Sequence, residues 1–288
     1  MIESNLTVVS GVSREVLDQL YKNQKVAIND LPLMPPLNPR DGLCLQSGSS
    51  SALAVVGPRV QTVELVSPNL KIESVKPRNR EQFLLLHSLM DPSIPLSVGI
   101  GKAGSGKTLL ALAAAIKLTL SANSIYKRII LTKPMDTVGK IQLGALPGDL
   151  HQKFSPYATS YTHQFEEILG EGRGEYIQTL FASGKIEYLP IQLMRGVSFK
   201  NTLVVADEVQ SLSRHELLTI GTRMSANSKL ILLGDLAQRD RVIDIRDTGL
   251  YQLCTSEAAT RSPLVSITVL EKNERSPIVD VFCDALGD

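Results

Sequence analysis

The sequence predicts an α/β fold with a mostly parallel β-sheet, preceded by a small strand-rich module. After about residue 77, short apolar segments typical of strands alternate with segments of helical periodicity. Within that region the glycine-rich segment GIGKAGSGKT lies between a predicted strand and a predicted helix. The first 76 residues contain mainly strand and turn patterns. We therefore divide the 288-residue chain into a strand-rich linking module over 1–76 and an α/β domain over 77–288.

Capping and turn residues define the elements of the small module. Ser13–Lys22 combines an N-capping serine with an amphipathic pattern, which predicts a helix. A proline-rich linker, DLPLMPPLNP, follows it. The segment SGSSS separates LCLQ from ALAVVG, which predicts a β-hairpin, and VQTVELV predicts a third strand.

The larger domain contains one strand or helix pattern after another. REQFLLLHSLM predicts a helix, and the apolar, alanine-rich LLALAAAIKLTL predicts a helix that is largely buried. The predicted strands are PLSVGI, RIILT, IEYLP, TLVVA, KLILL and VSITVL. Their continuous apolar character indicates central strands that are buried on both faces, with helices on both sides of the sheet.

The glycine-rich segment fits the phosphate-loop pattern G-x-x-x-x-G-K-[ST]. Glycines let backbone amides surround phosphate oxygens, and the following helix adds the positive end of its dipole. The expected nucleotide contacts are Gly101, Lys102, Ala103, Gly104, Ser105, Gly106, Lys107 and Thr108. Lys107 is expected to reach the β- and γ-phosphates and Thr108 to bind Mg²⁺. The alternative is a glycine loop that binds no ligand.

Two acidic residues follow the buried strand TLVVA. Ligands of such sheets bind at the carboxyl ends of the strands. Asp207 is therefore expected to hold Mg²⁺ through water, and Glu208 to polarise the attacking water. The alternative is an acidic pair that only opens a turn.

Two further residues are candidates for contact with the γ-phosphate. Gln238 follows the strand KLILL and its Gly234-Asp235 end, where an amide can orient water, although Gly-Asp often only makes a turn. Arg275, in NERSPI, precedes a Ser-Pro helix start and could point its guanidinium into a phosphate site. The alternative for Arg275 is a surface arginine.

Composition narrows the class of protein. The net charge is +1, but residues 78–140 contain nine basic and three acidic residues, a local surplus that suits nucleotide, nucleic acid or both. The absence of tryptophan and the low aromatic content argue against a surface built mainly on base stacking. Three cysteines and four histidines lack metal-ligand spacing, and a scattered, odd cysteine count fits a reducing cytosol. No signal peptide or bilayer-spanning segment is recognised, so we expect a soluble, cytoplasmic protein without a membrane partner.

Together, several segments resemble the PhoH-like family of P-loop ATPases, relatives of the superfamily-one helicases. They are GKAGSGKT, IILTKPMDTVGKIQLGALPGD with the following SPY, VVADEVQSL, SKLILLGDLAQRD and NERSPI, in order between about residues 76 and 286. The resemblance implies a RecA-like fold, ATP hydrolysis, ring formation and a link to RNA. It also implies that Gln82, in PRNREQ, lies near the adenine.

The chain departs from the longer family members in three ways. Those members carry a PIN ribonuclease domain before a linking module, whereas residues 1–76 resemble only the linking module, so nuclease activity is not carried over. Lys133 stands where many relatives have arginine, which could alter a phosphate or RNA contact. Val209 stands where relatives usually have alanine, a conservative change. The glycine-rich loop 133–149 is either a nucleic-acid or pore loop coupled to hydrolysis, or a connection that packs on a neighbouring subunit.

The function predicted from these residues is Mg²⁺-dependent ATP hydrolysis coupled to RNA or single-stranded nucleic acid. Only one RecA-like core fits in the chain, and helicases that work as monomers need two, so we expect a homo-oligomeric ring, with a hexamer favoured. The alternative is a nucleotide-dependent switch that hydrolyses ATP slowly to change the state of a protein partner, without nucleic acid.

Overall fold

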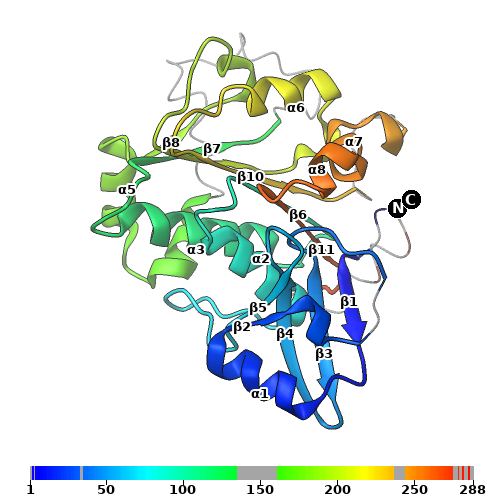
Figure 1. The fold of residues 1–288 in the computed structure, drawn as a ribbon. Helices are drawn as coiled ribbons and strands as arrows, with labels where there is room; N and C mark the ends of the chain where they lie inside the picture. Colours follow the sequence, from blue (N-terminus) through cyan, green and yellow to red (C-terminus); the bar gives the residue numbers. More distant parts are fainter. Residues whose placement is uncertain are drawn as a thin grey trace.

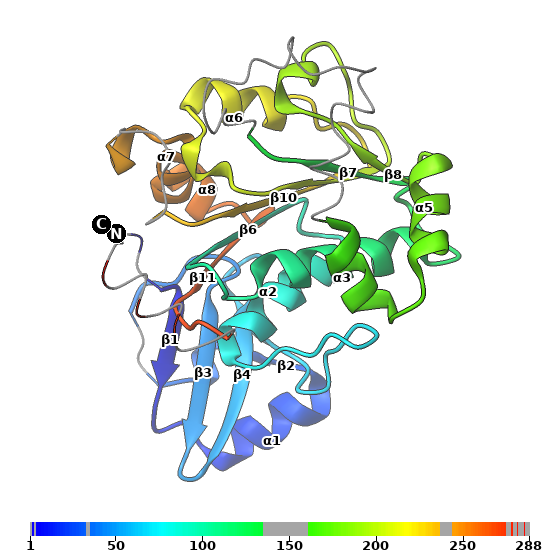
Figure 2. The same ribbon diagram turned by 180° about the vertical axis from the view of Figure 1, so that it is seen from behind.

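The computed structural model describes residues 2, 4–32, 35–134, 161–236 and 244–274, together with residues 278, 281 and 285. In it the chain forms one five-stranded and one six-stranded β-sheet. Helix α2 (Arg80–Met90) lies between the two sheets, as Figures 1 and 2 show from opposite sides.

The small sheet contains the hairpin and the third strand that the sequence predicts. Its order is β1-β3-β4-β5-β2, with β1 parallel to β3 and the other pairs antiparallel. The strands are β1 (Leu6–Val9), β2 (Lys25–Ala27), β3 (Gly42–Ser47), β4 (Ser50–Val56) and β5 (Thr62–Leu65), and a short 3₁₀ helix, η1 (Ile28–Asp30), follows β2. Strands β1 and β2 were not predicted, because segments of four and three residues carry too little periodicity.

Helix α1 (Arg14–Asn23) covers the small sheet on the side away from α2 (Figure 1). As predicted, Ser13 caps it, and the Ser13 hydroxyl accepts a hydrogen bond from the amide of Val16. Leu17 and Leu20 are buried under the helix against the strands.

The large sheet is entirely parallel, with the order β11-β6-β10-β9-β7-β8. Its strands are β6 (Leu96–Gly101), β7 (Arg128–Thr132), β8 (Ile186–Tyr188), β9 (Thr202–Ala206), β10 (Lys229–Gly234) and β11 (Val265–Leu270). All six predicted strands are present. Strand β6, which leads into the glycine-rich loop, is separated by β10 from β9, which leads into the acidic pair. The domain is α/β and RecA-like.

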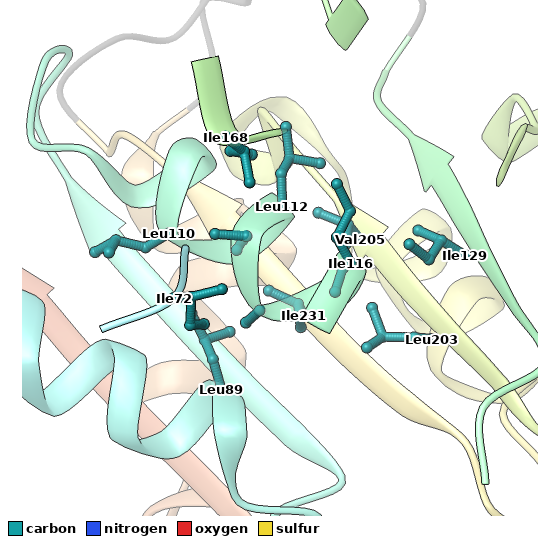
Figure 3. Packing of buried hydrophobic residues seen from close by; sticks show 14 of the residues in the cluster. Ile72, Leu89, Leu110, Leu112, Ile116, Ile129, Ile168, Leu203, Val205 and Ile231 are labelled. Atoms are coloured by element: carbon teal, nitrogen blue, oxygen red, sulfur yellow. The ribbon is translucent and has the colours of Figure 1, made fainter. Parts of the chain in front are cut away.

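Helices cover both faces of the large sheet (Figures 1 and 2). One face carries α2, α3 (Lys107–Leu120) and α5 (Gly174–Ala182); the other carries α6 (Arg214–Gly221), α7 (Gly249–Thr255) and α8 (Glu257–Thr260). The 3₁₀ helices are η3 (Ile191–Leu193), η4 (Val209–Ser211) and η5 (Ile245–Asp247). Figure 3 shows Leu112 and Ile116 of α3 packed against Leu203 and Val205 of β9.

The prediction that all strands are central is wrong for two of them. Strands β11 and β8 form the two edges of the sheet. In β11 buried residues alternate with partly exposed ones, because its two faces are covered to different extents. Strand β8 has one buried residue in three.

Polar contacts join the small module to the large domain. The Arg40 guanidinium donates to the carbonyl of Pro263 at 3.2 Å and to the Ser93 hydroxyl at 3.1 Å, and lies 3.5 Å from the Asp91 carboxylate. The side-chain amide of Asn5 donates to the carbonyl of Ile267 in edge strand β11. Arg40 is 7% exposed, whereas the Asp91 side chain is 25% exposed, so only the arginine side of this ion pair is buried.

Candidate functional site

The loop between β6 and α3 needs glycine at several positions. A Cβ atom at Gly101 would lie 2.7 Å from the carbonyl oxygen of Leu270 and 2.8 Å from the Ser105 hydroxyl. Gly104 and Gly106 have positive φ angles of 80° and 82°, which side-chain-bearing residues rarely adopt. The backbone therefore curls tightly ahead of the amino end of α3, as a phosphate-binding loop requires.

Lys107 and Thr108 are the first two residues of helix α3, and their side chains bond to different partners. The Lys107 ammonium donates to the carbonyl of Gly101 at 2.9 Å and to that of Lys102 at 3.3 Å, so it lies across the loop. The Thr108 hydroxyl donates to the Asp207 carboxylate at 3.0 Å. One hydrogen bond thus joins the glycine-rich loop to the acidic pair, across a separation of 99 residues in the sequence.

Asp207 is a buried carboxylate at the carboxyl end of β9. Burial raises its pKa to about 6, and repulsion from Glu208 acts in the same direction. The Lys107 ammonium and the Thr108 hydroxyl lower the pKa, but by less. A hydroxyl beside a desolvated carboxylate is a donor set that suits Mg²⁺, which binds oxygen ligands and would offset the cost of burying the charge.

Glu208 has an unusual backbone conformation. Its φ of 57° and ψ of 35° lie in the left-handed region, which is costly for a residue with a side chain. The Glu208 carboxylate accepts a hydrogen bond of 2.7 Å from the side-chain amide of Gln210. The other end of that amide accepts from the backbone N–H of Asp235 at 3.1 Å, after β10.

Asp235 extends this connection to the glycine-rich loop, because its carboxylate accepts from the amide of Ala103 at 2.9 Å. The sequence analysis identified Asp235 only as part of a strand end and did not select Gln210. The one signal for Gln210 was its place two residues after the acidic pair. Its role depends on β9 and β10 being neighbours, which the sequence does not reveal.

Gln82 lies behind the loop, on α2. Its side-chain amide donates to the carbonyl of Ser105 at 2.8 Å, and its side-chain carbonyl accepts from the amide of Arg78 at 2.8 Å. Gln82 is 4% exposed, and a Cβ at Gly106 would lie 2.8 Å from its nitrogen. Both ends of this side chain are thus bonded to the backbone of the chain.

Comparison with known proteins identifies the family of the chain. The model of the family described as PhoH-like protein matches residues 74–286. The chain belongs to the PhoH-like family. This places it among P-loop ATPases, which bind nucleotides. The assignment confirms the resemblance that the sequence motifs indicate.

Two PhoH2 proteins align with nearly the whole chain, and a PhoH-like protein aligns with about half of it. A PhoH2 protein of Thermobispora bispora is 35% identical across 100% of the chain, and a PhoH2 protein of Bacillus subtilis is 32% identical across 96%. A PhoH-like protein of Synechocystis is 39% identical across 49% of the chain and 41% of its own length. The chain spans 64% and 62% of the two PhoH2 proteins, less than two thirds of their length.

A solved Pif1 helicase structure from Candida albicans is a weaker match to this PhoH-like chain. It is 16% identical, with a TM-score of 0.37, over 73% of the chain and 43% of the helicase. The RecA-like assignment rests on the strand order, not on this similarity. Among the residues that the structure describes, no helix is both long and apolar enough to cross a bilayer.

The segment after β11 returns to the phosphate loop of the same PhoH-like chain. The amide of Glu274 donates to the carbonyl of Gly104 at 3.0 Å. The Arg78 guanidinium donates to the carbonyl of Glu274 at 2.8 Å, and the Asn79 side chain donates to its carboxylate at 2.6 Å. Arg275 and Gln238, two of the predicted catalytic residues, lie outside the described residues, as does the 135–149 part of the predicted moving loop.

Two buried hydroxyls remain near the acidic pair of the PhoH-like site. Thr132, at the end of β7, accepts a backbone hydrogen bond of 2.9 Å from Asp207 through its carbonyl. Within the described part of the chain, its hydroxyl and that of Tyr161 have no hydrogen-bond partner. Burial, together with the nearby charges of Asp207 and Glu208, raises the pKa of Tyr161 well above its ordinary value. Neutral hydroxyls thus lie beside the acidic pair.

Proposed function

We propose that this chain hydrolyses ATP in the presence of Mg²⁺. One observation carries the proposal: the Thr108 hydroxyl lies 3.0 Å from the Asp207 carboxylate, so the phosphate loop and the acidic strand end form one site. A threonine and a carboxylate in this relation form the metal site of P-loop enzymes.

The residues divide the chemistry between them. The amides of the loop 101–106 and the Lys107 ammonium bind phosphate oxygens, while Thr108 and Asp207 hold Mg²⁺, which neutralises phosphate charge when bound. Glu208 takes the role of the group that polarises the attacking water, and Gln238 orients it. Gln82 holds the loop through its hydrogen bond to the carbonyl of Ser105. We also propose that Gln82 lies near the adenine of the bound nucleotide.

We assign Arg275 to the γ-phosphate of its own chain. The support is Glu274, whose amide bonds to Gly104 of the same chain and whose carboxylate and carbonyl are held by Asn79 and Arg78. The described chain thus contacts its own phosphate loop at Glu274, the residue directly before Arg275 in the sequence.

We further propose that hydrolysis is coupled to RNA or single-stranded nucleic acid in the cytoplasm, by a homo-oligomeric ring that we expect to be a hexamer. The support is the single nucleotide-binding sheet and the basic surplus between residues 78 and 140. The division into a module over 1–76 and an ATPase domain over 77–288 is part of this proposal.

ATP hydrolysis measured with and without RNA and single-stranded DNA, beside a sizing measurement, tests the coupling. We expect RNA to raise turnover of the wild type, and the sizing to give an oligomer. Turnover that no nucleic acid changes would favour the nucleotide-dependent switch instead. Absence of any Mg²⁺-dependent hydrolysis would contradict the proposed activity itself.

A further inference from the structure

We propose that Gln210 is a positioning residue, which orients the Glu208 carboxylate and links it to the phosphate loop. This inference rests on the proposed ATP hydrolysis and adds to it a residue that acts through Glu208 rather than on the nucleotide.

Gln210 contacts Glu208 directly. The side-chain amide of Gln210 donates to the Glu208 carboxylate at 2.7 Å, and Gln210 is 3% exposed. A buried amide in a fixed place holds its partner more tightly than one in solvent. The left-handed backbone conformation of Glu208 sets the direction of its side chain. The hydrogen bond from Gln210 then fixes the position of the carboxylate.

Gln210 is also connected to the loop through Asp235. The Gln210 carbonyl oxygen accepts from the amide of Asp235 at 3.1 Å, and the Asp235 carboxylate accepts from the amide of Ala103 at 2.9 Å. Ala103 lies within the phosphate loop. These hydrogen bonds form an unbroken chain from the loop to Glu208. A change in the conformation of the loop on nucleotide binding can therefore shift Glu208.

Gly234 makes room for this arrangement. A Cβ atom at Gly234 would lie 3.1 Å from the Gln210 side-chain oxygen and 2.7 Å from a methyl group of Leu250. The approach of β10 to Gln210 therefore depends on the absence of a side chain there.

The two contacts require an amide of this length. Glutamine donates with its nitrogen and accepts with its oxygen. Glutamate of the same shape could accept from Asp235 but could not donate to Glu208. Methionine of similar length could do neither. Substitutions at this one position therefore separate the two contacts.

The experiment compares Gln210→Glu and Gln210→Met with the wild type in steady-state hydrolysis and in binding of a fluorescent ATP analogue. Gln210→Glu should lower kcat by about 10- to 100-fold, the effect of a misplaced catalytic group, and leave nucleotide affinity within about twofold. Gln210→Met should lower kcat similarly. It should also weaken nucleotide binding, because the backbone N–H of Asp235 loses the side-chain oxygen that accepts its hydrogen bond. Gln192→Glu, at an exposed position, is the matched control and should behave as wild type.

A double variant tests whether Gln210 acts through Glu208. Glu208→Gln combined with Gln210→Glu should turn over no more slowly than Glu208→Gln alone, because the partner is already altered. Thermal melting shows whether each variant is folded.

Two results would overturn the inference: a kcat of Gln210→Glu within twofold of the wild type, or an additive loss in the double variant. If the wild type binds ATP but does not hydrolyse it, the proposed function fails separately. The Gln210 link to the loop is then judged by binding alone, where Gln210→Met should be weaker than Gln210→Glu and equal affinities would contradict the link.

Discussion

At the scale of single residues, Asp207 and Glu208 are neighbours with different surroundings. Asp207 is bonded to Thr108 and influenced by Lys107, whereas Glu208 is bonded to Gln210. The two carboxylates therefore have different hydrogen-bond partners, and we propose that Asp207 holds Mg²⁺ with Thr108 whereas Glu208 activates water.

The two acidic residues should fail differently when they are replaced. Glu208→Gln is expected to bind Mg-ATP with an affinity within a fewfold of wild type and to lower turnover about 100-fold or more, because only water activation is lost. Asp207→Ala is expected to raise the Mg²⁺ concentration needed for nucleotide binding. Titrations of nucleotide and Mg²⁺ on both variants measure this. An equal loss of ATP binding in the two variants would contradict the assignment.

The candidate residues that could be recognised from the sequence are those that stand close together in one local motif. The loop 101–108 and the pair after TLVVA could be selected as candidates because strand ends in parallel sheets lie at one edge. Gln210, Glu274 and the loop-holding contacts of Gln82 could not be assigned, because each depends on which elements pack together.

At the scale of elements, helix α2 contacts the phosphate loop near its first residue and Lys229 of β10 near its last. Near its start, Gln82 holds Ser105 of the loop, and Glu81 accepts from the amide of Glu271 after β11 at 2.8 Å. At its end, the buried ammonium of Lys229 donates to the carbonyls of Ser88 and Asp91 at 2.9 and 3.0 Å, and to that of Ile94. Lys229 thus caps the carboxyl end of the helix.

Replacing Lys229 should change how the free energy of unfolding varies with pH. Burial lowers the pKa of Lys229 to about 7, although the Asp91 carboxylate raises it. The unfolded chain holds the proton up to about pH 10.4, so unfolding takes up a proton between these values, and raising the pH stabilises the folded wild type. Lys229→Met lacks this linkage.

Denaturant unfolding of wild type and Lys229→Met at pH 7, 8 and 9 measures the difference. We expect the stability advantage of the wild type to grow with pH, by up to about 1.4 kcal/mol per unit. Parallel pH dependence of the two proteins would contradict a displaced Lys229 pKa.

The elements themselves were largely predictable, and their order in the sheet was not. The helix over Arg80–Met90 matches its prediction residue for residue, because the asparagine cap and the apolar pattern are local signals. The edge positions of β8 and β11 and the presence of β1 and β2 depend on partners distant in the sequence.

At the scale of the whole molecule, the small module contacts the large domain through an apolar cluster around Leu84 of α2 and through polar contacts of Arg40. Arg40 reaches Asp91, Ser93 and Pro263, close to the end of α2. The module therefore contacts the same helix whose other end holds the phosphate loop.

Removing the Arg40 charge should loosen this attachment. Arg40→Met removes the guanidinium from the partly buried Asp91 carboxylate, and breaking a fully buried ion pair costs about 3 to 5 kcal/mol. We discount this to about 1 to 3 kcal/mol because Asp91 is 25% exposed. Arg14→Met, at an exposed position on α1, is the control. Denaturant unfolding and limited proteolysis between residues 57 and 79 measure the effect; an unchanged stability and cleavage pattern would contradict it.

Mixing two inactive proteins tests whether the arginine acts within its own chain. Arg275→Ala and Lys107→Ala proteins should each be inactive, since an arginine finger is typically worth ~10³ to 10⁵ in turnover. If Arg275 serves its own loop, no site in the mixture is complete and activity stays near zero. Recovery of activity in mixed oligomers would show that the arginine acts across an interface, and full activity of Arg275→Ala alone would remove it from the mechanism.

The central claim is Mg²⁺-dependent ATP hydrolysis at the loop that contains Lys107, and one measurement tests it most directly. Phosphate release from ATP is followed with purified wild type and with Lys107→Ala, each with Mg²⁺ and with EDTA. We predict hydrolysis by the wild type that requires Mg²⁺, and a turnover lower by about 10²-fold or more in Lys107→Ala, because a preorganised charge partner of the phosphoryl group is lost. Equal turnover in the two folded proteins would contradict the account.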